Sequence, residues 1–485
     1  MEKYGIAQAV RRKEDSRFLT GSGRYLDDIR LDNMAYGLVL RSPHAHALLK
    51  KIDTSAATKV PGVLMIFAGT DWEAEGLGDI PTRTRAKNSD GSPVPTPPRP
   101  ALVKDCVRFV GDAVAFIVAE TLAAAKDAVE LIHIDYDPLP AVTDAKQAIE
   151  PGAPLVWEDI PGNLCVDFEA GDKATVDATF AHAERIVSVD LVNNRVTAAP
   201  IEPRAAIGQY DREQDKFTLI SNAQNIHAIR NQLAEKIFRV PSERIRHVAY
   251  DVGGGFGAKN ALYPEYALVL FAARRLNRPI KWVNDRSESF VSDNHGRDQH
   301  SHVELALDAN GYFLALRVNS VGNIGAYVAS TGPFTPAGGT VRTQGGTYRI
   351  PVIYFRARAI FTNTAPIDPY RGAGRPEATY QIERAVDLAA MELGMDPAEL
   401  RRRNLIRRSD LPYKTGVGLE IDSGDFEHVL DRALEFAGWD RFPERAAAAR
   451  ATGHRRGISV AMYLGLTGGM REEYAALTFE KDGGI

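Results

Sequence analysis

The segment that most constrains the fold is a glycine-rich loop near the middle of the chain, residues 252–259, with the sequence VGGGFGAK. Its glycines let the backbone approach a ligand closely and direct several N–H groups at an anion. Residues 245–252 predict a strand before the loop, and Pro264 opens a predicted helix behind it whose N-terminus would favour the same anion. The pattern predicts anion or cofactor binding in a fold built from both strands and helices.

Two other interpretations of this loop stay open on the residues alone. Gly253, Gly255 and Ala258 fit the G-x-G-x-x-A pattern of a dinucleotide-binding βαβ unit, which would indicate a nicotinamide-dependent Rossmann oxidoreductase. The acid that would bind the ribose is Asp285, but it lies about thirty residues after the first glycine, where roughly twenty is typical. The third interpretation is a tight turn with a structural role only.

Length and composition indicate a globular protein of several domains. At 485 residues the chain is too long for one ordinary core, and about 150 residues per domain predicts roughly three. Hydrophobic residues make up 44% and charged residues 25%, and the net charge of -4 gives no electrostatic reason to expect a nucleic-acid partner. A small-molecule substrate is expected.

The chain contains two cysteines, Cys106 and Cys165. They exclude a disulfide framework and cannot supply the four ligands that an iron–sulfur cluster usually needs, so any such cluster is expected on another chain. The N-terminal residues include Arg11 and Arg12 but no apolar stretch behind them, and no run is long enough to span a bilayer. A cytoplasmic location without a membrane span is therefore expected.

Predicted elements divide the chain into units. Residues 1–150 predict an α+β domain, with short strands at 35–40, 63–67, 114–119 and 131–136. Inside it, residues 87–100 are rich in proline, serine and glycine and predict a long surface loop. Residues 151–172 combine PGAP, IPGN and an acidic run and predict a connector.

Longer elements are predicted beyond the connector. Apolar residues at helical spacing predict a helix at 223–238 that Pro241 closes and a helix that starts at Pro264, followed by a strand at 280–283. Further predictions are helices at 377–394, 426–437 and 441–451 and a strand at 458–463.

Seven groups of motifs follow one another along nearly the whole chain. They are EDSRFLTGSGRYLDD with RSPHAHA, RFVGDAVAFIVAET with HIDYDPLPAV, NNRVTAAPIEPRAAIG, SNAQN, the glycine loop, RPIKWVNDR and DPYRGAGRPEATY. In this order they resemble the molybdopterin-binding large subunits of the xanthine dehydrogenase, aldehyde oxidase and aerobic carbon monoxide dehydrogenase family. An ordered set is much more specific than any single motif, so the chain is identified as a member of this family.

The resemblance implies an α+β architecture and a function. An N-terminal α/β hammerhead-type domain at 1–150 and the connector at 151–172 would precede a first molybdopterin-binding domain at 173–410 and the incomplete start of a second at 411–485. The implied function is that of an oxidoreductase component that hydroxylates an aldehyde or N-heterocycle carbon with oxygen from water. The cofactor would be molybdenum–molybdopterin in its cytosine dinucleotide form, with FAD and an iron–sulfur (2Fe-2S) cluster on partner subunits.

Three catalytic residues follow from the resemblance. Gln224 matches the glutamine that hydrogen-bonds an oxygen ligand of molybdenum, Phe256 matches the aromatic residue beside the metal, and Arg371 matches the substrate-facing loop. All three would also contact the cofactor or its substrate, as would the backbone N–H groups of residues 255–257. The remaining implied positions are the cofactor-binding Gly254, Gly255 and Gly257 and the substrate loop Gly372, Ala373 and Gly374. The pterin holds the metal, so no side-chain metal ligand is expected.

Each assignment has a structural alternative. Gln224 could be a surface or helix-start residue, Phe256 a core residue and Arg371 part of a structural salt bridge. The Glu202-Pro203-Arg204 segment also matches the family, but an acid and a base two residues apart predict a local structural brace rather than a catalytic pair. The neighbouring histidines at 44 and 46 are predicted to be structural as well.

The sequence departs from the family pattern in three places. The copper-binding cysteine of carbon monoxide dehydrogenases is absent from the 372–374 loop, which argues against copper chemistry. The purine-binding phenylalanine and glutamate of xanthine-oxidising relatives are replaced by Ala373 and Asn260. Family chains also continue into further glycine-rich loops and a glutamate that is the general base, which leads us to expect a further chain supplying the rest of the molybdopterin domain. A truncated, non-catalytic remnant is the alternative, and substrate identity stays open.

Overall fold

The computed structural model describes residues 9–466 together with residues 477 and 479. Its helices are α1 (Asp15–Leu19), α2 (Gly69–Ala74), α3 (Leu122–Glu130), α4 (Ala145–Ala148), α5 (Lys173–His182), α6 (Ile226–Gln232), α7 (Pro264–Leu276), α8 (Arg286–Ser292), α9 (Arg375–Leu393), α10 (Pro397–Asn404), α11 (Phe426–Ala437) and α12 (Phe442–Ala451). Its strands are β1 (Ala35–Arg41), β2 (Ala47–Asp53), β3 (Val63–Ala68), β4 (Cys106–Val107), β5 (Ala113–Ala119), β6 (His133–Pro138), β7 (Leu164–Gly171), β8 (Arg185–Asn193), β9 (Ala205–Asp211), β10 (Lys216–Ser221), β11 (Ile245–Val248), β12 (Ile280–Val283), β13 (Gln299–Leu307), β14 (Phe313–Gly325), β15 (Val352–Phe361), β16 (Tyr413–Lys414) and β17 (Glu420–Ile421). Among these described helices, none has the length and apolar character needed to cross a membrane.

A mixed seven-stranded sheet carries the glycine loop at one edge, in the order β11-β10-β9-β12-β1-β5-β3. β11 is the edge strand and pairs in parallel with β10, which pairs antiparallel with β9. Helix α7 packs on this sheet, and Phe217 of β10, Phe271 of α7 and Trp282 of β12 share one buried cluster. This apolar packing gives the loops that follow β10 and β11 a rigid base.

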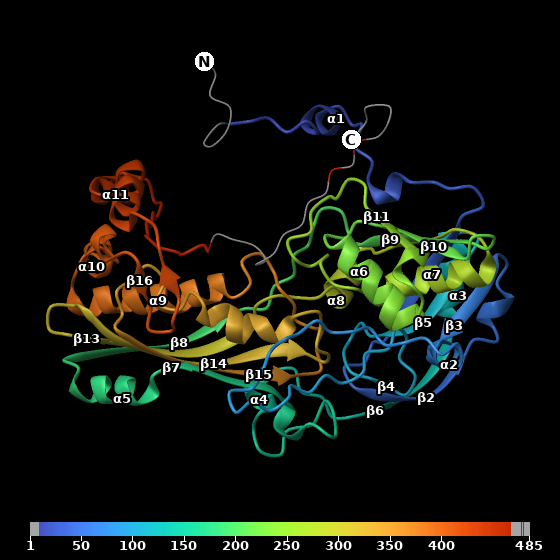
Figure 1. Cartoon of the computed structure of the whole chain (residues 1–485), viewed down its shortest axis with the longest axis horizontal. Coiled ribbons are helices and arrows are strands. Elements are labelled where there is room, and N and C mark those ends of the chain that lie inside the picture. Colours follow the sequence, from blue (N-terminus) through green and yellow to red (C-terminus); the bar gives the residue numbers. More distant parts are fainter. Residues whose placement is uncertain (1–8, 467–476, 478, 480–485) are drawn as a thin grey trace.

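A smaller three-stranded sheet, β4-β2-β6, lies beside strands β5 and β3 of the seven-stranded sheet (Figure 1). Helix α3 packs against β1 and β5, and Thr121 caps it by accepting a hydrogen bond from the Ala124 N–H. The predicted 87–100 loop has no helix or strand. These elements form the N-terminal α+β unit that the sequence predicts.

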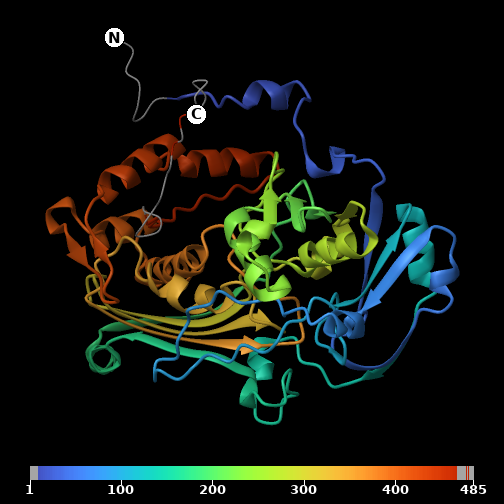
Figure 2. The same ribbon diagram turned by 45° about the vertical axis from the view of Figure 1, so that its right-hand side comes forward.

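A five-stranded sheet, in the order β7-β15-β14-β13-β8, makes up the other half of the molecule. Figure 1 shows α9 on one face of this sheet and α5 on the other. The chain leaves β15 through residues 362–374 and enters α9 at Arg375, so the predicted substrate loop lies at the start of a long, well-packed helix. In Figure 2 the red helices α11 and α12 lie on the far side of α9 from the sheet.

Most long elements lie where the sequence predicts them. Helices α7, α9, α11 and α12 and strands β1, β3, β5, β6 and β12 agree with the predictions within a few residues. The mixed α/β architecture is confirmed. The seven-stranded sheet combines strands from residues before 150 and after 173, so the predicted domain boundaries stay predictions.

Four predictions need correction. The 151–172 connector contains a strand, β7, which pairs antiparallel with β15, and its acidic residues Asp167 and Glu169 form ion pairs with Arg356 of that strand. The strand predicted at 245–252 ends at Val248, and the helix predicted at 223–238 is a regular helix to Gln232 and a π-helix from Leu233 to Phe238. Residues 458–463 form no strand within the described part of the chain, although Met462 is buried.

Candidate functional site

Gln224 lies in the turn between β10 and α6, against the glycine loop. Its Oε1 accepts a hydrogen bond of 2.8 Å from the Gly257 N–H, and its own backbone N–H donates to the Lys259 carbonyl at 2.9 Å. Because the Gly257 N–H requires an acceptor, the amide orientation is fixed and Nε2 is the outward donor of this exposed side chain. A Cβ on Gly255 would lie only 2.5 Å from Gln224 Oε1, which explains the glycine there.

Phe256 is not a core residue. Its side chain is 42% exposed and its backbone is left-handed, with φ of +54°. Gly254 and Gly257 on either side also have positive φ, at +96° and +101°. A non-glycine residue in this conformation is uncommon and costs free energy, so the surrounding fold holds the backbone of Phe256 in it.

Arg371 meets the glycine loop directly. Its backbone N–H donates to the Phe256 carbonyl at 2.9 Å, and its guanidinium carbon lies 5.9 Å from the centre of the Phe256 ring. A Cβ on Gly257 would overlap the Pro369 carbonyl, so the two loops touch through their backbones. Within the part of the chain that the structure describes, the exposed Arg371 side chain forms no ion pair, which disfavours the salt-bridge alternative.

The 372–374 loop has a shape that depends on its glycines. Gly372, Ala373 and Gly374 all have positive φ, at +96°, +39° and +93°. A Cβ on Gly372 would lie 2.6 Å from Pro376 Cδ, and one on Gly374 would overlap the backbone of Gly339. Only position 373 therefore carries a side chain without displacing its neighbours.

Three backbone donors of the glycine loop are left without a protein acceptor. In the described residues, no hydrogen bond uses the N–H groups of Gly254, Gly255 or Phe256. The Gly257 N–H, which the resemblance offers as a cofactor donor, is already bound by Gln224. The Gly257 N–H therefore fixes the orientation of the Gln224 amide, and the cofactor role of the loop donors stays a prediction.

Glu202 supports the glycine loop, a role that the sequence did not reveal. Its Oε2 accepts a hydrogen bond of 2.7 Å from the Gly253 N–H, and the buried Lys259 donates from Nζ to the Glu202 carbonyl at 2.8 Å. Burial lowers the pKa of Lys259 to about 8, although Glu202 opposes this shift. The match of Glu202-Pro203-Arg204 to the family motif predicts a structural brace, and these contacts agree with a structural role for Glu202.

Glu202 and Arg204 pair with other residues rather than with each other. The fully buried Arg204 instead contacts Glu265 at 2.8 Å and Asp293 at 2.5 Å, and its guanidinium lies 3.6 Å from the Tyr263 ring centre. Burial would raise the pKa of Glu265, but Arg204 and Arg41 lower it to about 2. The first turn of α7 is thus occupied by a buried charge network.

The dinucleotide-binding interpretation and the proposed help from the following helix both fail on this geometry. α7 begins at Pro264, well past the glycine loop, and its first turn faces the Arg204 network. β11 and β12 are separated by β10 and β9, one of which runs antiparallel to its neighbours. Asp285 caps α8 by accepting the Glu288 N–H at 2.7 Å. The loop therefore does not sit in the strand–turn–helix unit that such a fold requires.

The predicted structural histidines lie elsewhere. His44 packs on Tyr136, and His46 Nδ1 contacts the Pro140 carbonyl at 2.8 Å. No cluster of three or more potential metal-binding side chains occurs in the described residues. Cys106 and Cys165 are buried in β4 and β7, and burial raises the pKa of both thiols.

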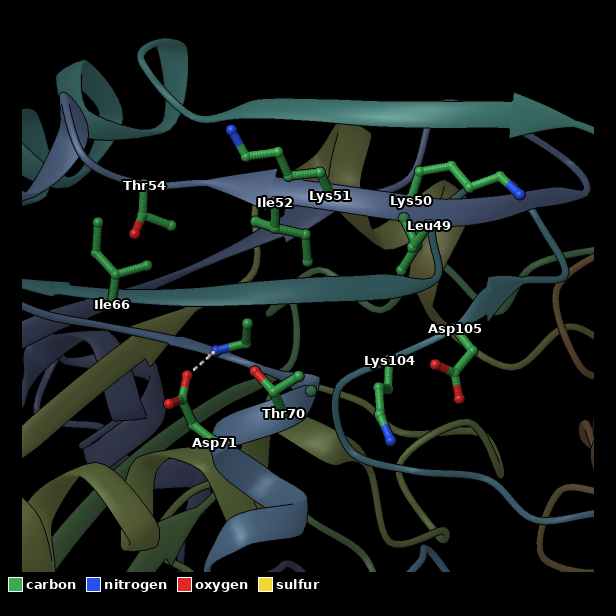
Figure 3. A pocket seen from close by; sticks show the side chains of 12 residues that line it. Leu49, Lys50, Lys51, Ile52, Thr54, Ile66, Thr70, Asp71, Lys104 and Asp105 are labelled. Carbon is green, nitrogen blue, oxygen red and sulfur yellow. Dashed lines mark hydrogen bonds between the residues drawn. The ribbon is translucent and has the colours of Figure 1, made fainter.

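A separate cavity of about 380 Å³ lies in the N-terminal unit (Figure 3). Leu49, Ile52 and Ile66 form one side, and the opposite side is polar, with the Asp71 side chain accepting from the Ala68 N–H at 2.8 Å. Its lysines are neutralised by nearby acids, in the pairs Lys50–Asp137, Lys51–Asp53 and Lys104–Glu73. The cavity contains none of the predicted site residues and is not the candidate site.

Comparison with known protein families matches most of the chain to two models. Residues 156–405 match the molybdopterin cofactor-binding domain, and residues 20–140 match the a/b hammerhead domain of aldehyde oxidase and xanthine dehydrogenase. Both matches confirm the fold that the motifs imply.

Individual proteins show the same similarity. The carbon monoxide dehydrogenase large chain of Hydrogenophaga pseudoflava is 36% identical over 90% of this chain and 55% of its own length. The nicotine 6-hydroxylase large subunit of Paenarthrobacter nicotinovorans is 32% identical over 97% of this chain and 57% of its own length. The crystal structure of quinoline 2-oxidoreductase from Pseudomonas putida 86 superposes with a TM-score of 0.85 at 34% identity, covering 92% of this chain and 56% of that one. The chain thus spans a little over half the length of these relatives.

Proposed function

Because this chain belongs to the molybdopterin-binding large subunits of the xanthine dehydrogenase, aldehyde oxidase and carbon monoxide dehydrogenase family, we propose that its glycine loop and substrate loop form one wall of a molybdenum-cofactor site. The enzyme to which it contributes would hydroxylate an aldehyde or N-heterocycle carbon. The observation that carries the proposal is the convergence of Gln224, Phe256 and Arg371, which are far apart in the sequence, around three unused backbone donors.

The residues present fit an anionic, oxygen-rich cofactor. The N–H groups of Gly254, Gly255 and Phe256 have no acceptor in the described residues, and the glycines leave room for a close approach. Gln224 adds an outward amide donor, and Arg371 adds a positive charge. No carboxylate of the described chain forms an ion pair with Arg371, so its charge is available to a ligand.

Each residue has a role that follows from its geometry. When bound, the cofactor supplies the two-electron oxidation of the substrate carbon, with water as the source of the oxygen. Gln224 would donate from Nε2 to a cofactor oxygen without adding charge, while Gly257 fixes the direction of that donor. Arg371 would orient a polar substrate or the cofactor through its guanidinium, and the exposed Phe256 ring would exclude water beside it.

The substrate loop argues for an aldehyde or N-heterocycle over carbon monoxide. A cysteine at position 372 or 374 would clash with Pro376 or with the backbone of Gly339, and both cysteines of the chain are buried in other strands. At position 373 the small alanine leaves space that an aromatic side chain would fill. A loop of this shape is suited to a substrate larger than a diatomic gas.

We propose that further residues complete the site. The match covers about half of the relatives' length, and we propose that the remaining cofactor contacts and the general-base glutamate come from the equivalent of their other half, on this or a second polypeptide. FAD and an iron–sulfur cluster on partner subunits would carry the electrons away, and the cofactor would be the cytosine dinucleotide form. The native assembly would thus contain several subunits.

A substrate survey tests this function. The native complex would be given an aromatic aldehyde, quinoline and carbon monoxide in water enriched in oxygen-18, with an electron-accepting dye. We expect turnover of the aldehyde or the N-heterocycle, with the label in the product. Oxidation of carbon monoxide alone, or an unlabelled product, would contradict the proposal.

A further inference from the structure

Residues 295–298 contact the loop that carries Arg371. The Arg297 guanidinium donates to the Tyr370 carbonyl at 3.0 Å and to the Arg371 carbonyl at 2.7 Å. It also lies 4.9 Å from the centre of the Tyr370 ring. One buried arginine therefore binds the two consecutive carbonyls that lead into the substrate loop, and a planar guanidinium with several donors is suited to this task.

Glu377 completes this contact from the first turn of α9. Its Oε1 accepts from Arg297 at 2.9 Å, and its Oε2 accepts from the Gly374 N–H at 2.8 Å. The Arg297 side chain is 9% exposed and the Glu377 side chain 0% exposed. The Arg297–Glu377 pair thus holds the substrate loop at both ends, through the carbonyls of 370 and 371 and the N–H of 374.

The segment that carries Arg297 is itself fixed in an unfavourable backbone conformation. Arg297 and Asp298 both have positive φ, at +65° and +68°, which two consecutive non-glycine residues rarely adopt. Asp298 accepts a hydrogen bond of 2.7 Å from Arg195, and a Cβ on Gly296 would lie 2.6 Å from Tyr370 Cβ. Such strain persists only where the surroundings impose it, and it is concentrated at functional sites.

We propose that Arg297 and Glu377 are positioning residues that set the backbone of residues 370–374 and thereby aim the Arg371 side chain at the cofactor face. This inference rests on the proposed function and deepens it. Neither residue was singled out from the sequence as part of the site. The pair acts through Arg371, whose N–H in turn bonds the Phe256 carbonyl, so it connects the substrate loop to the glycine loop.

A general contribution to stability is the competing explanation, and the chain offers a matched control for it. Arg401 and Glu383 form a second buried pair, with side chains 0% and 6% exposed and contacts of 2.8 to 2.9 Å. Glu383 lies on α9, as Glu377 does, but the Arg401–Glu383 pair contacts neither the glycine loop nor the substrate loop. Breaking it removes a buried ion pair without touching the site.

The experiment compares Arg297→Lys and Glu377→Gln with Arg401→Lys and Glu383→Gln in the native complex. Hydrogen exchange of the 369–375 peptide is measured first. We expect exchange at least about tenfold faster in the two site variants, because each loses a charge-assisted hydrogen bond to the loop. In the two controls we expect the hydrogen exchange of this peptide to stay unchanged, even when their melting temperature falls as much as that of the site variants.

A double-mutant cycle separates positioning from stability. Because the pair acts through Arg371, we expect Arg297→Lys to lower kcat/KM in the wild type but to lower it by less than about twofold in an Arg371→Ala background. The inference would be overturned if Arg297→Lys lowered kcat/KM by the same factor in the wild type and in the Arg371→Ala background. It would also be overturned if the 369–375 peptide of the site variants exchanged as slowly as in the controls. If the native complex holds no molybdenum, the proposed function fails, while the exchange measurement still tests the pair. Because Arg297→Lys keeps the positive charge, this variant alone can be used for both measurements if Glu377→Gln does not fold.

Discussion

At the residue scale, Gln224 has two functions in one amide group. Its Oε1 binds the Gly257 N–H and its Nε2 faces outward. In Gln224→Glu the acceptor that holds the loop remains, but the outward donor becomes a charged acceptor. We expect kcat of the native complex to fall on the order of 10²-fold, as when a donor to a reacting oxygen is removed, with little change in melting temperature.

The neighbouring Asn225 provides the control for this prediction. It caps α6 by accepting the Ala228 N–H, so Asn225→Ser keeps a capping oxygen and leaves the glycine loop untouched. We expect this variant to retain wild-type kcat. A Gln224→Glu enzyme with unchanged kcat would show that the outward amide has no part in the reaction.

Gly257 tests the contact between the two loops. In Gly257→Ala the new Cβ meets the Pro369 carbonyl at a backbone φ of +101°, which an alanine tolerates poorly. We expect a loss of about 1–3 kcal/mol in the free energy of unfolding and a lower molybdenum content of the native complex. Gly457→Ala is the matched control, since no atom lies within 4 Å of its added Cβ. Equal molybdenum contents in the two variants would contradict this account.

His247 beneath the Gln224 turn gives a pH prediction. Its Nδ1 donates to the Ile226 carbonyl at 3.0 Å, and its Nε2 lies 2.7 Å from the Ser221 hydroxyl, which donates to it when the ring is neutral. Burial lowers the pKa of His247 from 6.5 to about 4. The unfolded chain therefore binds more protons between these values, so the contribution to stability is complete above pH 6.5 and is lost as the pH falls toward 4.

The measurement is urea unfolding of wild type and His247→Gln from pH 7 to pH 4. We expect the stability difference between them to change by roughly 2–3 kcal/mol across this window. Parallel pH profiles for the two proteins would show that His247 does not titrate in this way.

At the element scale, the first turn of α7 is stabilised by buried ion pairs. Glu265 pairs with Arg41 at 2.6 Å and with Arg204 at 2.8 Å. Because Glu265→Gln leaves two buried arginines with one acid fewer, we expect a loss of about 3 kcal/mol in the free energy of unfolding at pH 7. Glu75→Gln is the comparison, because its pairs with Arg274 and Arg275 at the other end of α7 are partly exposed, and we expect it to lose less than about 1 kcal/mol. Equal losses measured by urea unfolding would contradict this account.

The elements that the sequence predicted well are those with a strong local pattern. α7 begins at Pro264 and α11 extends from Phe426 to Ala437 as expected, because helical periodicity and end signals are encoded within a few residues. β7 was missed because Asp167 and Glu169 resemble a loop until Arg356, almost two hundred residues away, pairs with them. Long-range partners of this kind cannot be read from a local pattern.

The same limit applies to the site. Gln224, Phe256 and Arg371 were found through ordered motifs, and the structure brings them together. Glu202 and Arg297 were not assigned to the site, because their partners, the Gly253 N–H and the carbonyls of 370 and 371, are backbone groups without a sequence signature. A residue whose contacts are with the backbone becomes visible only once the loops are folded.

At the scale of the whole molecule, the candidate site joins the two large sheets. The glycine loop extends from the edge of the seven-stranded sheet, and the substrate loop comes from the end of the five-stranded sheet. The two are connected by the Arg371–Phe256 hydrogen bond. We therefore expect the geometry of the site to depend on how the two sheets pack.

The central claim is that this chain holds a molybdenum cofactor through the glycine and substrate loops. Its most direct test is the molybdenum and molybdopterin content of the native complex, purified with its partners and compared with the same complex carrying Gly257→Ala. We predict about one molybdenum per chain in the wild type and a clear loss in the variant, with flavin and iron unchanged. A well-assembled wild-type complex with flavin and iron but no molybdenum would contradict the account and support a non-catalytic remnant.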